Sequence, residues 1–274
     1  MLRLRSVMFV PGGRADMIAK VGRFAPDVAV VDLEDALAAA DKDEGRCVTA
    51  RSLVALQSPA ATTVLVRVNP VGTPWFARDV SMAASSPADG VVLPKLARST
   101  DLAALQAELA RHGRPDAVII GGIETGLGVA DARRLIPGLN ACYFGAEDYI
   151  ADLAGHRSAA GLEVLYARSQ VCLAAHLAGV PAIDQAVVSV TDEQQFLADA
   201  RDGAALGYQG KICIHPSQVR LAHEVFTPSA PEIAHARAVL DAAAAGVGVL
   251  DGQMVDDVHV RMAHTVLRRA GGAA

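Results

Sequence analysis

Acidic side chains close two successive apolar runs of this sequence, and their type suits metal-assisted chemistry on an oxygen-rich small molecule. Glu124 follows one run and Asp148 follows the next. Mg²⁺ prefers a few carboxylate oxygens and completes its coordination with water and substrate oxygens. The sequence therefore predicts Glu124 and Asp148 as ligands of Mg²⁺. The alternative is that both acids cap the helices that follow, because acidic side chains favour helix N-termini.

Polar groups of the same kind follow other apolar runs and are predicted to bind the substrate. The guanidinium of Arg67 can hold a carboxylate or an enolate oxygen in bidentate fashion. It can also form a buried salt bridge with Glu34 or Asp35, and the two roles are compatible. Asn69 lies two residues further on. Lys95 follows a proline at a strand end, where it is either a Schiff-base lysine or an ion-pair partner.

Other catalytic motifs find no support. The glycine-rich segment 121–128 fits neither the dinucleotide pattern G-x-G-x-x-G nor the Walker pattern. The sequence contains no G-x-S-x-G elbow and no H-E-x-x-H zinc motif. His215 precedes a proline and is interpreted as a loop histidine rather than a catalytic one.

The composition indicates a protein that handles small molecules. The chain has 274 residues, 52% of them hydrophobic and 4% aromatic, and a net charge of −5. Nucleic-acid binders usually carry a basic face, so no nucleic-acid partner is expected. The four cysteines form no C-x-x-C pair, which indicates buried thiols in a reducing, cytoplasmic compartment. The N-terminal apolar run stops at Pro11, and no stretch reaches the ~18 residues of a membrane span, so neither export nor membrane insertion is expected.

Eight short apolar runs alternate with Ala- and Leu-rich segments of helical periodicity. Several runs are rich in Val and Ile without alternating polar residues, as is typical of parallel strands covered on both faces. Eight strand–helix units predict an α/β fold, a (β/α)₈ barrel in which the strand ends that carry the polar residues meet on one face. An open doubly wound sheet is the alternative. The expected strands are Ser6–Val10, Val28–Leu33, Val64–Val68, Gly90–Leu93, Ala117–Ile123, Ala141–Phe144, Gln185–Val188 and Lys211–Ile214.

The barrel is predicted to occupy residues 1–226 and a C-terminal helical extension residues 227–274. Two prolines after Phe226 break the last barrel helix. The extension is expected to contain a helix over Glu232–Ala245, a turn through Gly246–Gly252 and a helix over Val258–Arg269.

Taken in order, these motifs resemble the successive blocks of the citrate lyase beta-subunit-like proteins of the HpcH/HpaI aldolase superfamily. The blocks run from residue 5 to residue 256 and cover nearly the whole chain. They are Arg5–Gly12, Asp32–Ala36, Arg67–Asn69, Leu93–Lys95, Ile123–Thr125, Phe144–Asp148, Gly210–Gln218 and Gly252–Asp256.

The resemblance implies a (β/α)₈ barrel that assembles as a trimer or hexamer. It implies Glu124 and Asp148 as the metal ligands, Arg67 as the substrate-gripping arginine and Glu34 as part of the same catalytic network. It also implies that Asp256, in the C-terminal extension, acts as a lid carboxylate in the active site of a neighbouring subunit.

The C-terminal block departs from the family pattern in two ways. Val258 stands where a proline is usual, and a second acid, Asp257, adjoins Asp256. Either acid is therefore a candidate for the lid carboxylate.

The reaction expected from the resemblance is a Mg²⁺-dependent retro-Claisen or retro-aldol cleavage. A β-hydroxyacyl thioester of the citramalyl-, malyl- or citryl-CoA type would yield a keto acid and an acyl-CoA. Arg67 would stabilise the developing enolate, and Asp256 would exchange a proton with its carbon. Two alternatives remain: a citrate lyase beta subunit that acts only within an acyl-carrier complex, and an aldolase that works through a Lys95 imine. The sequence does not specify the acyl group, the carrier or the direction of the reaction.

Overall fold

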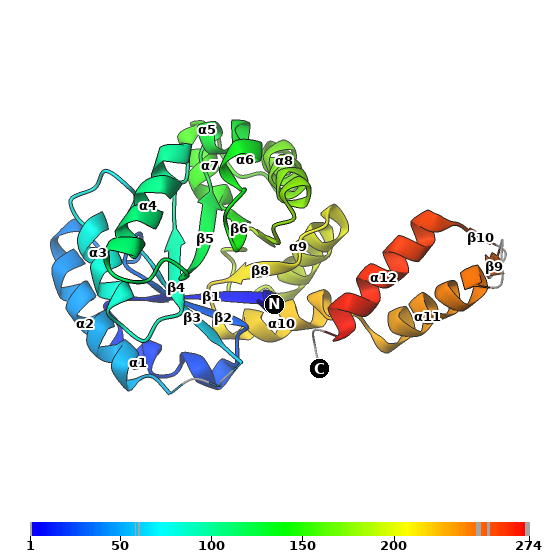
Figure 1. Cartoon of the computed structure of the whole chain (residues 1–274), viewed down its shortest axis with the longest axis horizontal. Helices are drawn as coiled ribbons and strands as arrows, with labels where there is room; N and C mark the ends of the chain where they lie inside the picture. The colour runs from blue at the N-terminus through cyan, green and yellow to red at the C-terminus, as the bar shows by residue number, and fades with distance from the viewer. Residues whose placement is uncertain (1, 58, 60, 245–247, 251–252, 272–274) are drawn as a thin grey trace. The chain divides into compact units, whose positions relative to one another are not determined.

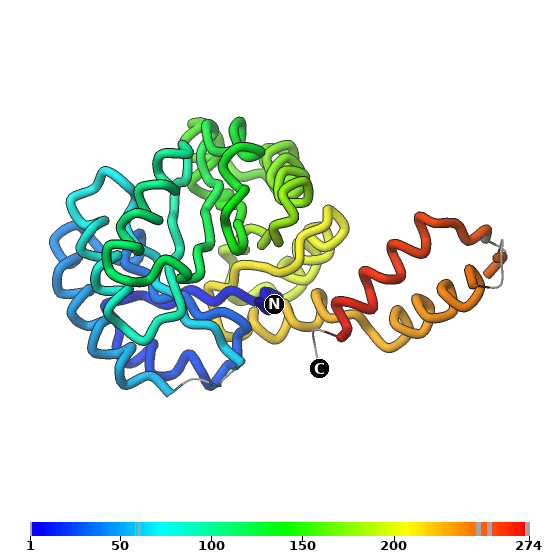
Figure 2. Tube along the Cα trace, in the orientation of Figure 1, coloured from blue at the N-terminus to red at the C-terminus, as the bar shows by residue number. Residues whose placement is uncertain are grey.

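The computed structural model describes residues 2–57, 59, 61–244, 248–250 and 253–271. The chain forms two compact units, one made by Leu2–Ala222 and a second that begins at His223. Figures 1 and 2 follow the chain from blue at the N-terminus to red at the C-terminus. Among the described residues, no helix is both long enough and apolar enough to cross a bilayer.

Eight parallel strands of the first unit form a closed barrel in chain order. Each strand pairs with the next, and β8 closes the barrel by pairing with β1, where Val7 lies opposite Ile212. This arrangement confirms the predicted (β/α)₈ fold and excludes the open sheet. The strands are β1 (Ser6–Pro11), β2 (Val28–Asp32), β3 (Thr63–Arg67), β4 (Gly90–Leu93), β5 (Val118–Ile123), β6 (Ala141–Phe144), β7 (Ala182–Asp184) and β8 (Gly210–Cys213).

Helices connect the strands and surround the barrel (Figure 1). Local caps fix several of their ends: Thr125 caps α5 by accepting the N–H of Gly128, and Asp192 caps α9 by accepting the N–H of Gln195. The helices are α1 (Ala15–Ile18), α2 (Lys42–Ala55), α3 (Phe76–Ala84), α4 (Ser99–Arg111), α5 (Gly126–Ala130), α6 (Ala132–Leu135), α7 (Ala146–Asp152), α8 (Leu162–Ala178), α9 (Glu193–Leu206) and α10 (Pro216–Phe226), with 3₁₀ turns at Val21–Phe24 and Ala39–Asp41.

Branched apolar side chains fill the interior of the barrel. Inward residues such as Val30, Leu65, Ile120 and Ile183 are at most 2% exposed. Because residues two positions apart on a strand point the same way, each inward apolar residue predicts the direction of the residue two positions later. This alternation aims the polar residues at the strand ends toward the same interior.

The seventh strand lies upstream of its predicted position. The structure places β7 at Ala182–Asp184, and residues 185–188 form the loop that follows it. Asp184 is a fully buried strand residue that pairs with Arg168 and Lys211. The prediction began this strand after Asp184, because the partners that stabilise a buried charge within a strand come from distant elements.

The second unit is a helical hairpin with a short antiparallel ribbon. Its elements are α11 (Ala230–Ala244), β9 (Gly248–Leu250), β10 (Gln253–Val255) and α12 (Asp257–Gly271). Ala236, Val239 and Ala263 form the apolar contact between the two helices. The predicted turn at residues 246–252 lies partly outside the described residues, and its described part, Gly248–Leu250, is a strand rather than a turn.

Candidate active site

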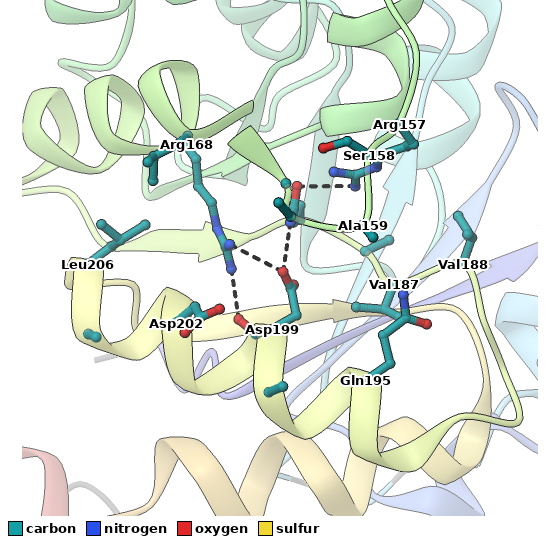
Figure 3. A pocket seen from close by; sticks show the side chains of 17 residues that line it. Arg157, Ser158, Ala159, Arg168, Val187, Val188, Gln195, Asp199, Asp202 and Leu206 are labelled. Carbon is teal, nitrogen blue, oxygen red and sulfur yellow. Dashed lines mark hydrogen bonds and ion pairs between the residues drawn. The ribbon is translucent and has the colours of Figure 1, made fainter. Parts of the chain in front are cut away.

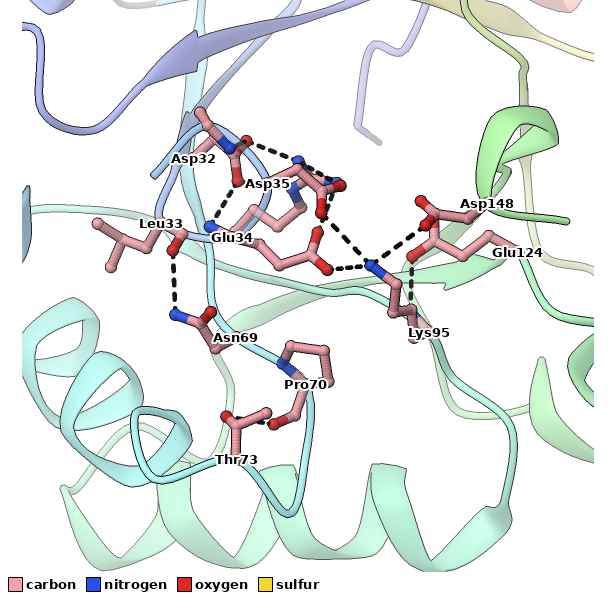
Figure 4. A network of polar contacts seen from close by, with 12 residues as sticks. Asp32, Leu33, Glu34, Asp35, Asn69, Pro70, Thr73, Lys95, Glu124 and Asp148 are labelled. Atoms are coloured by element: carbon pink, nitrogen blue, oxygen red, sulfur yellow. Dashed lines mark hydrogen bonds and ion pairs between the residues drawn. The ribbon is translucent and has the colours of Figure 1, made fainter. Parts of the chain in front are cut away.

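Charged side chains from five consecutive strand ends converge at the carboxyl end of the barrel (Figure 4). Asp32 and Arg67 end β2 and β3, and each lies two positions beyond an inward apolar residue of its strand. Lys95 follows β4 by two residues, Glu124 directly follows β5, and Asp148 lies in the first turn of α7 after β6. The barrel thus brings together residues that are separated by more than a hundred positions in the sequence.

Arg67 is held by a bidentate ion pair with Asp32. Its Nε donates to Asp32 Oδ1 at 2.7 Å, and its Nη2 donates to Asp32 Oδ2 at 2.6 Å. Its Nη1 lies 2.9 Å from Glu34 Oε2, and its Nη2 lies 3.4 Å from Asp35 Oδ2. Nε and Nη2 of the guanidinium are therefore committed to Asp32. Nη1 pairs with Glu34 but carries two N–H groups, so one of them can meet a substrate oxygen.

Glu34 and Asp35 were the predicted salt-bridge partners of Arg67, and the bidentate partner Asp32 was not predicted. A signal for this contact existed, because strand alternation places both residues inward. In the parallel register of β2 and β3, Asp32 lies directly opposite Arg67. Neighbouring inward residues of opposite charge on paired strands predict such a contact.

Glu34 is a buried carboxylate whose two oxygens face different cations, Lys95 and Arg67. Its Oε1 accepts a very short hydrogen bond from Lys95 Nζ, but its Oε2 has no hydrogen-bond partner among the described residues. Burial raises the pKa of Glu34 to about 7, although the positive charges of Arg67 and Lys95 act in the opposite direction. A carboxyl group with this pKa can accept or release a proton near neutral pH.

Lys95 lies among carboxylates in a strained backbone conformation. Its φ of 51° falls in the left-handed region that residues other than glycine seldom adopt. Its Nζ contacts Glu34 and lies 3.3 Å from Asp148 Oδ1 and 3.5 Å from Asp35 Oδ1. Burial by itself lowers the pKa of Lys95, but the hydrogen bond to Glu34 and the nearby negative charges raise it above its ordinary value. A firmly protonated ammonium is not a nucleophile, which argues against the Lys95 imine.

Glu124 is a buried acid beside a second, more exposed one. It is 1% exposed, and its Oε1 accepts the backbone N–H of Lys95 at 2.6 Å. Burial raises the pKa of Glu124, Arg67 lowers it, and the negative charge of Asp148 raises it further. The two carboxylates lie side by side in Figure 4. Gly145 leaves room for the side chain of Glu124, because a Cβ atom at position 145 would clash with it.

The helix-cap alternative does not account for Glu124. Thr125, not Glu124, accepts the N–H of Gly128 at the start of α5, at 3.0 Å. Asp148 does lie in the first turn of α7, where an acid is favoured by the helix dipole, but its side chain makes no capping hydrogen bond there. Glu124 therefore remains a buried carboxylate without a structural role as a cap.

The donor set fits Mg²⁺ better than zinc. Within the described parts of the chain, no group of three or more His, Cys, Asp or Glu side chains is placed to hold a metal ion. Mg²⁺ characteristically uses one or two carboxylates and fills its other positions with water and substrate oxygens. A buried carboxylate also gains from a nearby cation, because an unpaired buried charge is costly. Glu124 and Asp148 provide both features.

Sequence comparison assigns the chain to a family. The family model described as HpcH/HpaI aldolase/citrate lyase matches residues 5–216. The chain belongs to this family. The match confirms the resemblance inferred from the ordered motifs, and it makes the protein an enzyme of the carbon–carbon lyase class.

Three members of the HpcH/HpaI aldolase/citrate lyase family show how far the similarity extends. The citrate lyase subunit beta-like protein of Deinococcus radiodurans is 48% identical over 96% of both chains. A (3S)-malyl-CoA thioesterase of Cereibacter sphaeroides is 31% identical over 98% of this chain and 95% of its own. The crystal structure of the Mycobacterium tuberculosis protein CitE in complex with magnesium, acetoacetate and coenzyme A is 33% identical, covers 98% of this chain and 100% of its own, and has a TM-score of 0.84.

The side-chain amide of Asn69 is already hydrogen-bonded to protein groups through both its oxygen and its nitrogen. Its Oδ1 accepts a hydrogen bond from Lys42 Nζ at 2.7 Å, and its Nδ2 donates to Leu33 O at 3.0 Å and to Asp79 Oδ2 at 2.6 Å. The amide therefore joins the loops after β2 and β3 rather than facing the rim. The predicted substrate contact of Asn69 finds no support in this geometry, and a positioning role replaces it.

The predicted lid acid lies outside the barrel unit. Asp256 caps α12, where its Oδ1 accepts the N–H of Val258 at 2.9 Å and the N–H of His259 at 3.2 Å. The contact with His259 lowers the pKa of this exposed carboxylate. Asp257 is the first residue of α12. A role for either acid in a neighbouring active site stays a prediction.

A separate hollow of about 580 Å³ lies between α8, α9 and the loop after β7 (Figure 3). Its buried polar groups already satisfy one another: Arg168 pairs with Asp184 and Asp199, and the amide of Gln185 donates to Asp199. The rim site, by contrast, leaves polar atoms unsatisfied. The candidate active site is therefore the rim and not this hollow.

Proposed function

We propose that the chain is a Mg²⁺-dependent lyase that cleaves the carbon–carbon bond of a β-hydroxyacyl thioester into a keto acid and an acyl-CoA. The observation that carries the proposal is the meeting of two carboxylates, Glu124 and Asp148, beside Arg67 at the carboxyl end of a barrel of this family. The magnesium, acetoacetate and coenzyme A bound by the Mycobacterium tuberculosis relative support it.

Glu124 and Asp148 would hold the metal ion. Bound there, Mg²⁺ supplies Lewis-acid polarisation of the substrate oxygens and a template for its hydroxyl and carboxylate groups. Glu124 is fixed by the N–H of Lys95, so it offers its other oxygen in a defined direction. Asp148 is partly exposed and can adjust to the ion.

The remaining groups supply charge stabilisation and proton transfer. A base removes the proton of the substrate hydroxyl, that oxygen becomes the carbonyl of the keto acid, and the electrons of the broken bond pass to the thioester as an enolate. Nη1 of Arg67 would donate to the enolate oxygen, while Asp32 holds the guanidinium in place. Glu34, with a pKa near 7, is the candidate base on this chain. Protonation of the enolate carbon would fall to Asp256 or Asp257 of a neighbouring subunit.

The direct test is a Mg²⁺-supplemented assay of citramalyl-, malyl- and citryl-CoA that measures released keto acid and free CoA thiol separately. Cleavage gives keto acid and acyl-CoA without free thiol, and EDTA should abolish it. The 31% identity to a malyl-CoA thioesterase makes hydrolysis the second candidate, and free thiol without keto acid would establish it. An adduct trapped by borohydride on Lys95 would instead support the imine mechanism. Turnover seen only after adding an acyl-carrier partner would support the citrate lyase complex.

We expect the reaction to lose its base as the pH falls through about 7. Glu34 has a raised pKa, so it carries a proton below pH 7 and is a carboxylate above it. If its carboxylate is the base, kcat/KM rises with pH and levels off above about pH 7. Glu34→Gln should lower kcat/KM and remove this inflection.

His215→Gln is the matched control for this experiment, because it replaces a histidine that follows β8 and has no contact with Glu34 among the described residues. His215 is exposed at the loop after β8 and contacts Ser217. The H215Q variant should keep the inflection. An inflection that disappears in H215Q and persists in E34Q would reject Glu34 as the base.

We also propose that the chain assembles with copies of itself, as the resemblance implies. Helix α8 is apolar on its outer face as well as its inner one, and a helix that is apolar all round is normally buried. Tyr166 and Leu173, on the outer face of α8, are 71% and 54% exposed in the single chain. A second copy of the chain is the partner that these side chains fit best, since homo-oligomers bury apolar surface of this kind.

Leu173→Glu is expected to shift the protein toward the monomer because it places a charge in the proposed interface. Light scattering after size-exclusion chromatography would measure the change in mass. Val54→Glu is the control, because Val54 is 77% exposed on α2. A wild-type monomer, or an oligomer that L173E leaves intact, would contradict the assignment of this face.

A further inference from the structure

Tyr143 lies beneath the candidate active site with its ring in the barrel core. It is 2% exposed on β6, and its ring packs edge-on against Phe9, with 6.2 Å between the ring centroids. Its hydroxyl lies against Gly122 of β5, where any side chain would clash with it. Glu124 lies two positions after Gly122, so the two residues face the same side of this segment. The Tyr143 hydroxyl therefore lies at the floor of the site, below the predicted metal ligand.

The hydroxyl of Tyr143 has no hydrogen-bond partner among the described residues, although it is buried. In the same set of residues, only four buried side-chain atoms lack a partner, and a second one, Glu34 Oε2, belongs to the same site. A buried hydroxyl without a partner costs roughly 1–3 kcal/mol, whereas phenylalanine would fill the same space without this cost. Glu34 Oε2 still has the charge of Arg67 beside it, whereas the Tyr143 donor has no such partner, which indicates that a bound molecule completes it.

The surrounding charges keep this hydroxyl as a neutral donor. Burial raises the pKa of Tyr143, the nearby Glu124 carboxylate raises it further, and Arg67 acts in the opposite direction. The phenol therefore retains its proton throughout the neutral range. The Glu124 carboxylate lies near enough to raise the pKa of the phenol through its charge and as a hydrogen-bond partner, but the hydroxyl makes no hydrogen bond of ordinary geometry among the described residues.

We propose that Tyr143 is a substrate-binding residue whose hydroxyl donates a hydrogen bond to an oxygen of the bound 2-oxo acid. This inference rests on the function proposed above and specifies the part of the substrate that the floor of the site recognises. Arg67 Nη1 meets the reacting oxygen from the side of β3, and Tyr143 meets the keto-acid half from β6.

The Tyr143→Phe variant removes only the hydroxyl and keeps the ring that packs in the core. Calorimetric titration of pyruvate in the presence of Mg²⁺ should show an affinity roughly ten- to a hundredfold weaker than that of wild-type protein, because one hydrogen bond to a charged group is lost. The melting temperature of Y143F should equal or exceed that of wild type, because an unsatisfied buried hydroxyl is removed.

Tyr208→Phe is the matched control. Tyr208 is also fully buried, but its hydroxyl donates to Arg168 O at 2.7 Å in the outer layer of the barrel unit. Y208F should lower the melting temperature, because it leaves that carbonyl without its partner, and should leave pyruvate affinity unchanged. A loss of pyruvate affinity in Y143F alone and a loss of melting temperature in Y208F alone would separate a ligand contact from a packing role.

Three outcomes would overturn the inference. Y143F that binds pyruvate as tightly as wild type, with unchanged kcat/KM, would show that the hydroxyl does not contact the ligand. Y143F with weakened Mg²⁺ binding in the absence of pyruvate would assign the hydroxyl to Glu124 instead. Wild-type protein that does not bind pyruvate with Mg²⁺ and does not release keto acid from any thioester would overturn the proposed function, and this inference with it.

Discussion

Glu124→Gln is expected to lower kcat/KM roughly a thousandfold or more and to remove measurable Mg²⁺ binding while the barrel stays folded. The substitution keeps the shape of the side chain and an oxygen that can accept the N–H of Lys95. It removes one of the two negative charges that attract the ion, and a metal acting as Lewis acid accounts for several kcal/mol of transition-state stabilisation. Calorimetric titration of Mg²⁺ and the keto-acid assay measure the two effects.

The stability of E124Q should not fall with its activity. Burial makes the ionised form of Glu124 unfavourable, as the direction of its pKa shift shows. Replacing this charge by a neutral amide should therefore leave the melting temperature unchanged or raise it, as is common when a functional charge is removed. If E124Q lost activity because it unfolded, its melting temperature would instead fall.

Glu147→Gln is the matched control for E124Q. Glu147 precedes Asp148 in α7, but its side chain is half exposed and pairs with Arg157 rather than with Arg67 or Lys95. E147Q should bind Mg²⁺ and turn over substrate as wild type does. If E124Q binds Mg²⁺ with wild-type affinity, the metal site lies elsewhere and the proposed mechanism is wrong.

The charge balance of the rim favours the divalent cation that is proposed to bind there. Within the described cluster, five carboxylates accompany two cationic side chains, so the cluster carries a net negative charge when all of these groups are ionised. Burial and, less strongly, the negative charge of Asp35 raise the pKa of Glu34, so a proton on Glu34 would lower the negative charge of the site. Mg²⁺ at Glu124 and Asp148 would relieve the rest. The members of this cluster are Asp32, Glu34, Asp35, Glu124 and Asp148, with Arg67 and Lys95.

The architecture and the rim could be predicted from the sequence because both depend on local patterns. Eight apolar runs separated by helical segments specify a parallel barrel, and the polar residue that follows a run must lie at the carboxyl end of the barrel. Glu124, Asp148, Arg67 and Lys95 were placed at the rim by this rule. The family motifs then gave these residues chemical roles.

The details that the sequence did not give depend on contacts between distant segments. The pairing of Asp32 with Arg67 required the register of β2 and β3. Asn69 looked like a substrate ligand until Lys42, 27 residues earlier in the chain, was seen to occupy its amide oxygen. Tyr143 was read only as part of an apolar run, because nothing in that run shows that its hydroxyl lacks a partner. Tertiary partners decide whether a polar group is structural or available.

Arg67→Lys is expected to lower kcat/KM by roughly two to three orders of magnitude, although the positive charge is kept. The guanidinium contacts Asp32 through two nitrogens and faces Glu34 through a third. The lysine ammonium is a point charge that cannot contact Asp32 and Glu34 at the same time as the guanidinium does, and the lysine side chain is shorter than that of arginine. The donor to the developing enolate would be lost, and removal of one such donor typically costs 10²–10³ in kcat.

The same substitution should also destabilise the fold, by about 1–3 kcal/mol, because Asp32 and Glu34 lose charge-assisted hydrogen bonds in a buried site. Arg67→Met should be more damaging, by roughly 3–5 kcal/mol, since it leaves buried carboxylates without a counter-charge. Urea unfolding followed by circular dichroism would rank the two variants. Activity must therefore be compared at a temperature where each variant is fully folded.

Arg46→Lys is the control that distinguishes the effect of losing any buried guanidinium on stability from the effect of losing Arg67 on catalysis. Arg46 is also largely buried, and its Nε donates to Asp79 at 2.7 Å on the outer side of β3. R46K should lose stability to a similar degree and keep most of its kcat/KM. Near-normal turnover by R67K, or an equal loss of turnover in R46K, would show that Arg67 supports the fold alone and that another group stabilises the enolate.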